Sequence, residues 1–112
     1  MTELHLHQHK NFELPKNVPS DSSFINAAEM FQLINDPTRL KILWFLCHNE
    51  ICVNNIAITV NISPPLASHH LRLLKQAKLL ESSRHGKEVY YKLANTEEAI
   101  LLRRVLDNIL SV

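Results

Sequence analysis

The sequence predicts a small, mainly helical domain that carries one β-hairpin near its C-terminal end. The chain has 112 residues, which suits a single domain, and 46% of them are hydrophobic, which is enough for a core. Up to residue 79 the apolar residues recur mainly at the three-to-four-residue spacing of amphipathic helices. From there to residue 93 the period changes to about two, and β-branched and aromatic residues favour strands.

The first 20 residues differ in composition from the rest of the chain. They are polar, contain two prolines and show no apolar periodicity, so we expect residues 1–20 to form a flexible N-terminal arm. The folded domain then comprises residues 21–112. Asp21 or Ser22 can cap its first helix, because their side-chain oxygens can accept hydrogen bonds from free backbone N–H groups.

Two further helices follow, and each has a boundary signal. Asp36, directly before a proline, can cap the second helix. We expect Trp44 and Phe45 of this helix to pack in the core, as large aromatic residues usually do. Residues 53–60 have apolar positions at helical spacing and end at Asn61, a residue that tolerates left-handed backbone geometry.

A fourth helix begins directly after that turn. Ser63 can cap it, and Pro64 in the next position already holds a helical φ and needs no amide partner. Two short helices joined by a tight turn predict a helix-turn-helix, whose second helix enters the major groove of DNA. The apolar residues expected to face inward are Leu66, Leu71, Leu73, Leu74 and Ala77, and the polar residues on the other faces are Ser68, His69, Arg72, Lys75 and Gln76.

The hairpin that follows predicts a basic wing beside this helix. The four residues from Arg84 to Lys87 contain the only glycine of the chain and form the bend. Residues 62–93 contain six Lys or Arg against two Glu, a net charge of +4 in a chain whose total is +1. Positive charge is therefore concentrated where phosphates would lie. The predicted fold class is mainly α with a β-hairpin wing, a winged helix-turn-helix.

A last amphipathic helix predicts how the domain assembles. Asn95, with Glu98 three residues later, forms a capping box. The helix that it opens carries an apolar stripe that so small a domain cannot bury alone. We expect the first and last helices to pack against a second copy across a twofold axis, which suits a palindromic DNA site.

Composition excludes several classes of protein. The chain has no apolar run near the roughly 20 residues that span a bilayer, and its N-terminus lacks the pattern of a signal peptide, so we expect it in the cytoplasm. It also lacks a glycine-rich phosphate loop and a nucleophile with its base, which argues against an enzyme. Cys47 and Cys52 give no disulfide framework.

Three segments together resemble the ArsR/SmtB family of bacterial metal-responsive repressors. They are residues 36–43 (DPTRLKIL), 50–53 (EICV) and 68–74 (SHHLRLL), within a resemblance that spans about residues 22–112. The resemblance implies a homodimeric winged helix that blocks transcription until an inducer weakens its hold on the operator. It also implies one metal site on the final helix, whose positions here hold residues poorly suited to zinc-like ions: Asn95, Glu97, Asn108 and Ser111. We expect that site to be lost.

A second site of the family uses a Cys-x-Cys pair in the third helix together with cysteines from the arm. Here Cys52 matches the first cysteine of the pair, and Asn54 replaces the second. The arm carries His5, His7 and His9 instead, whose alternating spacing places three imidazoles on one side of an extended segment. Such a nitrogen and sulfur set suits zinc, nickel, cobalt or copper. The alternative is a buried apolar cysteine beside a solvated histidine tail.

The favoured function is an inducible DNA-binding repressor. A redox- or small-molecule-responsive repressor of the same fold, with Cys47 and Cys52 as a redox pair in the first case, is one alternative. A metal-buffering module without promoter control is another, although such a module has no need of the basic face. The residues expected to contact DNA are Ser63, Pro65, Ser68, His69, Arg72, Lys75, Arg84 and Lys87.

Overall fold

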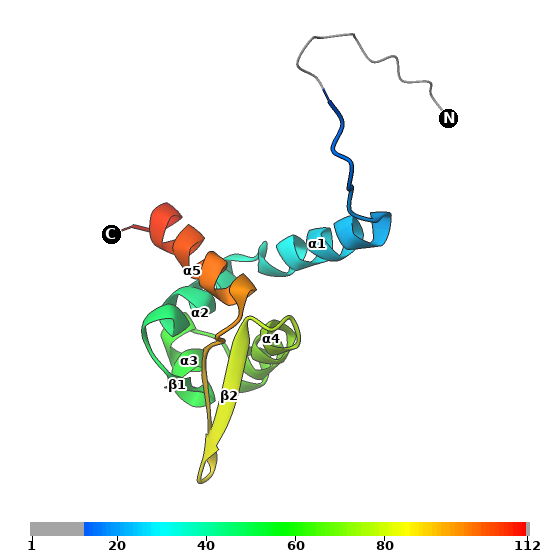
Figure 1. The fold of residues 1–112 in the computed structure, drawn as a ribbon. Helices are drawn as coiled ribbons and strands as arrows, with labels where there is room; N and C mark the ends of the chain where they lie inside the picture. Colours follow the sequence, from blue (N-terminus) through cyan, green and yellow to red (C-terminus); the bar gives the residue numbers. More distant parts are fainter. Residues whose placement is uncertain (1–12, 112) are drawn as a thin grey trace.

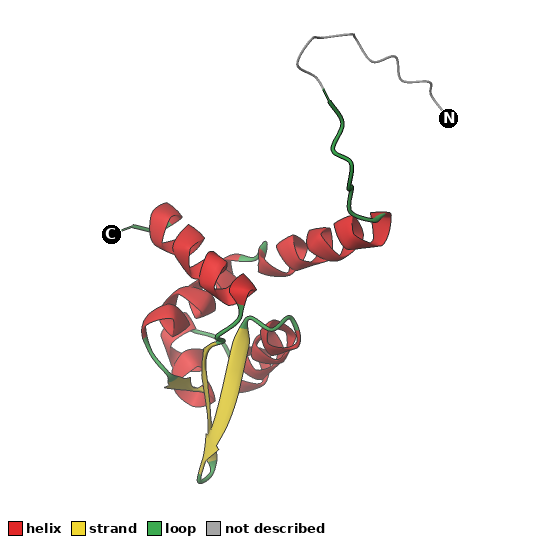
Figure 2. Ribbon diagram, viewed as in Figure 1, coloured by secondary structure: helices red, strands yellow, loops and turns green. Residues whose placement is uncertain are grey.

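The computed structural model describes residues 13–111, which form five helices and a small three-stranded antiparallel sheet (Figures 1 and 2). Residues 1–12, with His5, His7 and His9, lie outside the described residues. The predicted fold class, mainly α with a β-hairpin wing, is confirmed. The elements are α1 (Asp21–Ile34), α2 (Pro37–His48), β1 (Ile51–Cys52), α3 (Val53–Val60), α4 (Pro64–Gln76), β2 (Leu80–His85), β3 (Glu88–Leu93) and α5 (Glu97–Ile109).

The core lies between α2, α4, the sheet and the inner side of α5. Ile42 and Leu43 of α2 and Leu71 and Leu74 of α4 expose none of their surface. Burying a side chain of this size contributes about 1.5–3 kcal/mol, so these four positions anchor both helices in one common core. α1 contributes no buried residue and projects from this body (Figure 1). Among residues 13–111, no helix is long and apolar enough to cross a membrane.

Two helices begin at the caps that the sequence predicts. The carboxylate of Asp36 accepts a hydrogen bond of 3.2 Å from the backbone N–H of Arg39, and Pro37 begins α2. The Ser63 hydroxyl accepts one of 3.2 Å from the N–H of Leu66, with Pro64 as the first residue of α4. In both cases a proline directly after the capping residue marks the boundary.

The other two predicted caps are wrong by one or two residues. Ser20, not Asp21 or Ser22, caps α1, because its hydroxyl accepts from the N–H of Ser23. Thr96, not Asn95, caps α5, so the predicted capping box with Glu98 does not form. The Thr96 hydroxyl also donates to the carbonyl oxygen of Lys78 at 2.8 Å, and this contact ties the start of α5 to the end of α4.

Three side chains are less buried than the sequence pattern predicts. The spacing predicts that Leu66 faces inward, but 44% of its surface is exposed, and the neighbouring Ala67 is buried instead. Trp44 and Phe45 are only half-buried. They lie at the edge of the core rather than inside it, where they line an apolar hollow of about 340 Å³ between α2 and Leu110.

The sheet contains one strand that the periodicity did not predict. The β2–β3 hairpin pairs Leu80 with Leu93 at its base and His85 with Glu88 at its tip. On the other side of β3, Ile51 and Cys52 form β1 and pair with Tyr91 and Tyr90. The wing is therefore joined to the segment just before α3, which fixes its base against the helix-turn-helix.

Candidate nucleic-acid interface

The turn between α3 and α4 is fixed by the backbone. Asn61 has the left-handed geometry that the sequence predicts, with φ of 59°, and the N–H of Ile62 donates to the carbonyl oxygen of Ala57 at 2.9 Å. Such bonds satisfy the carbonyls left free at the end of a helix. Because the Ser63 cap follows two residues later, α4 leaves this turn in a set direction. The two helices form the expected helix-turn-helix.

Four residues of α4 form a continuous exposed line, which we call the α4 face. They are Pro65, His69, Arg72 and Gln76. Their spacing of four, three and four residues places them on one side of a helix. Leu71 and Leu74 point to the core, while Ser68 is half-buried at the edge of the α4 face. A rigid helix therefore presents a hydrogen-bonding surface to the outside.

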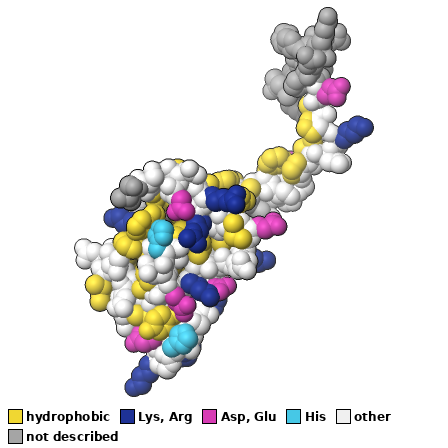
Figure 3. All heavy atoms as spheres, turned by 60° about the vertical axis from the view of Figure 1, so that its left-hand side comes forward, with side chains coloured by type: hydrophobic (Ala, Val, Ile, Leu, Met, Phe, Trp, Pro, Cys, Tyr) yellow, Lys and Arg dark blue, Asp and Glu magenta, His cyan; other side chains and the backbone are white. Residues whose placement is uncertain are grey.

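The wing presents positive charge at its tip. Gly86 and Lys87 form a two-residue loop, and Gly86 has φ of 64°, a value at which other residues are strained. Arg84 and Lys87 are exposed. In the space-filling view Lys and Arg side chains lie at the lowest point of the molecule, where the hairpin of Figure 1 turns (Figure 3).

The basic side chains of this region differ in what they contact. The Lys75 ammonium donates to the Ser82 hydroxyl at 2.8 Å, which leaves its charge uncompensated. Lys92 forms an ion pair of 3.3 Å with Glu81. Among residues 13–111, no ion pair is found for the three residues Arg72, Arg84 and Lys87. These three, with Lys75, remain available for phosphates.

A polar cluster joins the wing to the body of the domain. The Ser83 hydroxyl lies 3.1 Å from Glu50 Oε1 and 3.1 Å from His85 Nε2. His85 Nε2 is in turn 3.6 Å from Glu50 Oε1. Because Glu50 lies between α2 and β1 while the other two residues belong to β2, the cluster restrains the hairpin. No local sequence pattern indicates this contact, which joins residues 33 positions apart.

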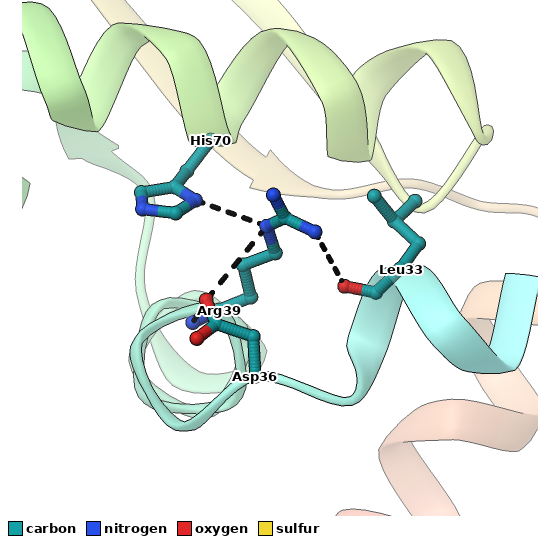
Figure 4. Close-up of polar contacts among 4 residues, drawn as sticks. All are labelled: Leu33, Asp36, Arg39 and His70. Atoms are coloured by element: carbon teal, nitrogen blue, oxygen red, sulfur yellow. Dashed lines mark hydrogen bonds and ion pairs between the residues drawn. The ribbon is translucent and has the colours of Figure 1, made fainter.

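Arg39 connects α1, α2 and α4 through a second polar cluster (Figure 4). Its Nε–H donates to His70 Nδ1 at 3.0 Å, and its Nη1 donates to the carbonyl oxygen of Leu33 at 2.9 Å. Asp36 Oδ2 lies 3.8 Å from the same Nε. The last turn of α1 is therefore attached to the middle of α4 through a single guanidinium group.

This contact determines the protonation state of His70. A guanidinium can only donate hydrogen bonds, so His70 Nδ1 must carry a free lone pair and the imidazole must be neutral. Burial is the main cause that lowers the pKa of His70, and the positive charge of Arg39 lowers it further. The carboxylate of Asp36 raises this pKa, and His69 lowers it by the smallest contribution. His69 itself is exposed on the α4 face, so the two adjacent histidines have different surroundings.

Both cysteines are buried as free thiols. Cys52 precedes the first residue of α3, has 7% of its surface exposed, and makes no side-chain cap bond there. Cys47 lies on α2, and burial raises the pKa of its thiol, with Arg103 lowering the pKa and Asp107 raising it. Among residues 13–111, no three side chains of His, Cys, Asp or Glu gather in a way that could hold a metal ion.

The structure thus brings most of the predicted DNA-contacting residues to two neighbouring elements, α4 and the wing. Sequence reasoning missed three features beside them: the Arg39–His70 contact, the cluster of Glu50 with the wing, and the exposure of Leu66. Arg39 stands within the family-like segment 36–43, which was the one available signal. The other two depend on contacts or exposure that no local pattern encodes.

Comparisons with known proteins agree with this geometry. The family profile described as "Bacterial regulatory protein, arsR family" matches residues 36–82. The transcriptional repressor SdpR of Bacillus subtilis is 45% identical over 67 residues, which cover 60% of this chain and 74% of SdpR. A Staphylococcus aureus homologue of the cadmium resistance transcriptional regulatory protein CadC is 39% identical over 82 residues, or 72% of this chain and 64% of that protein.

Solved structures show the same fold. The homodimeric winged helix-turn-helix DNA-binding domain of Mb0332 from Mycobacterium bovis, a possible ArsR-family regulator, is similar with a TM-score of 0.69 and 27% identity. The likeness covers 84% of this chain and 89% of that domain. The chain spans 62% to 74% of the length of the first three curated relatives that it matches.

Proposed function

The chain belongs to the ArsR family of bacterial regulatory proteins, and we propose that it is a homodimeric, DNA-binding transcriptional repressor released from its operator by an inducer. One observation carries the proposal. The α4 face lies on a helix fixed by its turn and cap, beside a wing whose Arg84 and Lys87 are free to meet phosphates. The family is one of regulators, as the sequence indicated, and not of enzymes.

The DNA contacts divide by chemistry. His69 and Arg72 carry ring and guanidinium donors that can reach base edges in the major groove, with Ser63, Pro65 and Ser68 nearby at the first turns of α4. Lys75, Arg84 and Lys87 are placed to meet the backbone, where they would fix the position of the protein without reading sequence.

A twofold dimer would place two such surfaces on a palindromic operator. The support is the apolar surface that α1 and α5 leave exposed: Phe24, Ile25, Phe31, Ile100, Leu101, Val105 and Ile109. These helices also flank an apolar hollow of about 270 Å³, lined by Phe31, Leu101 and Val105 among others. Apolar surface of this kind commonly marks an interface, and the Mycobacterium bovis domain with the same fold is homodimeric.

The test measures, by fluorescence anisotropy, how tightly the full chain binds labelled DNA from upstream of its own gene. A duplex of scrambled sequence is measured for comparison. We expect preference for the upstream DNA and an affinity that falls by on the order of 10³ to 10⁵ between 50 and 200 mM salt. Lys87→Ala should reduce the slope of the logarithm of the binding constant against the logarithm of the salt concentration by about one per subunit. Lys41→Ala, which changes an exposed lysine of α2 outside this surface, is the control. Equal binding to both duplexes would refute the repressor.

For the inducer we propose a transition-metal ion, with zinc, nickel, cobalt and copper as the ions that the donors suit. The ligands would be Cys52 and the arm histidines His5, His7 and His9, and the support is their donor chemistry together with the cadmium-resistance role in the name of one relative. The α5 positions do not fit a metal. Asn95 and Asn108 offer only amide groups, and the amide of Asn108 donates to the carbonyl oxygen of Arg104 at 2.9 Å.

Metal titration of the protein bound to its operator tests the ligands directly. Cys52→Ser should abolish release by the ion while it leaves operator affinity in metal-free buffer unchanged, and Cys47→Ser serves as the control. Deletion of residues 2–10 tests the histidines separately. Unchanged release in either variant would remove those residues from the site. Release by no ion in the wild type would favour a small organic inducer, because burial and the raised pKa of the Cys47 thiol disfavour a redox switch at that residue.

A further inference from the structure

The first turn of α4 presents an apolar surface at the end of the helix that would enter the groove. Pro64, Pro65 and Leu66 are consecutive and all exposed, and Leu66 has 44% of its surface accessible. Large apolar side chains are usually found inside proteins, where Leu71 and Leu74 of the same helix lie. Leu66 is therefore the large apolar side chain that the recognition helix leaves open to solvent.

This turn also lacks the donors by which helix starts usually hold phosphate. Pro64 and Pro65 have no N–H group. The N–H of Leu66 donates to the Ser63 hydroxyl at 3.2 Å, and the N–H of Ala67 donates to the Ser63 carbonyl oxygen at 2.9 Å. No backbone N–H of the first turn is left to bind an anion, although free N–H groups are the usual basis of phosphate binding at a helix start. What this turn offers to DNA is C–H surface.

The major groove has one apolar feature that such a surface can recognise, the 5-methyl group of thymine. Residues near the N-terminus of a recognition helix are those that reach base edges. Leu66 lies one turn before His69, so the two side chains are neighbours on the exposed side of α4. We propose that Leu66 is a specificity-determining residue that contacts a thymine methyl group in each operator half-site. The inference rests on the proposed DNA-binding function.

Removal of single methyl groups from DNA provides the test. The full chain first selects its preferred duplex from a random pool, and each thymine of that duplex is then replaced in turn by deoxyuridine, which lacks only the methyl group. We expect one thymine in each half-site to weaken wild-type binding by about fourfold when replaced, the effect of one buried methyl-sized group. Leu66→Ala should bind the thymine and deoxyuridine duplexes equally, and Leu66→Met should restore part of the difference.

Ile58→Ala is the matched control, because Ile58 of α3 is also an exposed apolar residue, with 76% of its surface accessible. This variant should keep the full response to deoxyuridine. Selection of no preferred duplex would refute the repressor function and with it this inference. A preferred duplex without a methyl-sensitive thymine, or a sensitivity that survives in Leu66→Ala, would overturn the role of Leu66 alone and leave the repressor function intact.

Discussion

α4 and α1 are both exposed along one side, yet they expose opposite kinds of surface. α4 buries Ala67, Leu71 and Leu74 and presents His69 and Arg72 outward. α1 buries no residue and presents phenylalanine and isoleucine side chains to solvent. Apart from Leu66 in the first turn, the first arrangement is complete within one chain, because its apolar side is covered and its polar side is solvated. The second leaves apolar surface exposed to water. Burying that surface would contribute a favourable free energy of about 25 cal/mol for each Å².

The difference gives the two helices different parts in the proposed function: α4 would contact DNA, and α1 would contact the second copy. The position of the α4 face is fixed by contacts within one subunit: the Ser63 cap, the turn at Asn61 and the core residues of α2. α1 is attached to the body by the hydrogen bond that Arg39 donates to the carbonyl oxygen of Leu33. In the proposed dimer a second copy would cover α1 and α5, so the spacing between two α4 helices would be set by the less self-sufficient region.

The largest effect is expected from a charge placed on the α1 surface. Phe31 is 69% exposed and lines the hollow beside Leu101 and Val105. In a dimer that covers this hollow, Phe31→Glu would bury an unpaired carboxylate, at a cost of about 3 kcal/mol or more. We expect the dimer dissociation constant to rise at least about a hundredfold, as measured by sedimentation velocity over a range of concentrations.

The adjacent residue provides the control for this change. Gln32→Glu adds the same charge to the same helix at a polar, exposed position. It should leave the dimer nearly unchanged, and both variants should keep the helical content of the wild type. Equal dissociation constants for the two variants would show that α1 is not covered in the dimer. α1 would then not differ from α4 in needing a second copy.

The sequence predicts the helix starts around the helix-turn-helix better than those of α1 and α5. The caps at Asp36 and Ser63 are predictable because a proline follows each one and fixes the start of the helix. Around α1 and α5 several oxygen-bearing side chains stand in a row, and the choice of Thr96 at α5 is accompanied by its bond to the carbonyl oxygen of Lys78, 18 residues earlier. Local pattern alone cannot rank such neighbours.

The features that the sequence did not predict are non-local for the same reason. β1 has two residues, which is too short for a periodicity, and it exists as a strand only through its pairing with Tyr90 and Tyr91 of β3. The contact between Arg39 and His70 joins residues 31 positions apart. Leu66 fits an apolar stripe by spacing, yet in three dimensions it lies on the exposed side of α4, away from the core. Residue type and spacing therefore predict the α4 face but not the non-local contacts that keep it in position.

A smaller effect is expected from pH, through the connection between the two regions. The pKa of His70 is lowered in the folded protein from its ordinary value of about 6.5. Below that pH the unfolded chain takes up a proton that the folded His70 resists, so its stabilising contribution is complete above about pH 6.5 and is lost as the pH falls towards the lowered pKa. Protonation would also end the acceptance of the hydrogen bond from Arg39.

Urea unfolding at a series of pH values between 7.5 and 5 measures this contribution. His70→Gln keeps an acceptor but cannot titrate, so it should lose less free energy of unfolding than the wild type over this range. His69→Gln removes a neighbouring, exposed histidine, whose charge is the smallest of the causes that act on the pKa of His70, so its profile should stay close to that of the wild type. Parallel profiles for all three proteins would mean that the attachment of α1 to α4 does not depend on the charge of His70.

The smallest effect is expected within the self-sufficient region, at the end of α4. Lys78 has φ of 64°, and the N–H groups of Lys78 and Leu79 donate to the carbonyl oxygens of Lys75 and Leu74, the pattern that normally places glycine at this position. A left-handed conformation costs a residue with a side chain about 1 kcal/mol, so Lys78→Gly should be more stable than Lys78→Ala by about that amount. Both variants lose the same charge, and unfolding at one fixed protein concentration keeps the contribution of dimerisation to stability the same for both. Equal stabilities would show that α4 ends without strain. A difference that disappears in the Phe31→Glu background would show that α4 depends on the dimer after all.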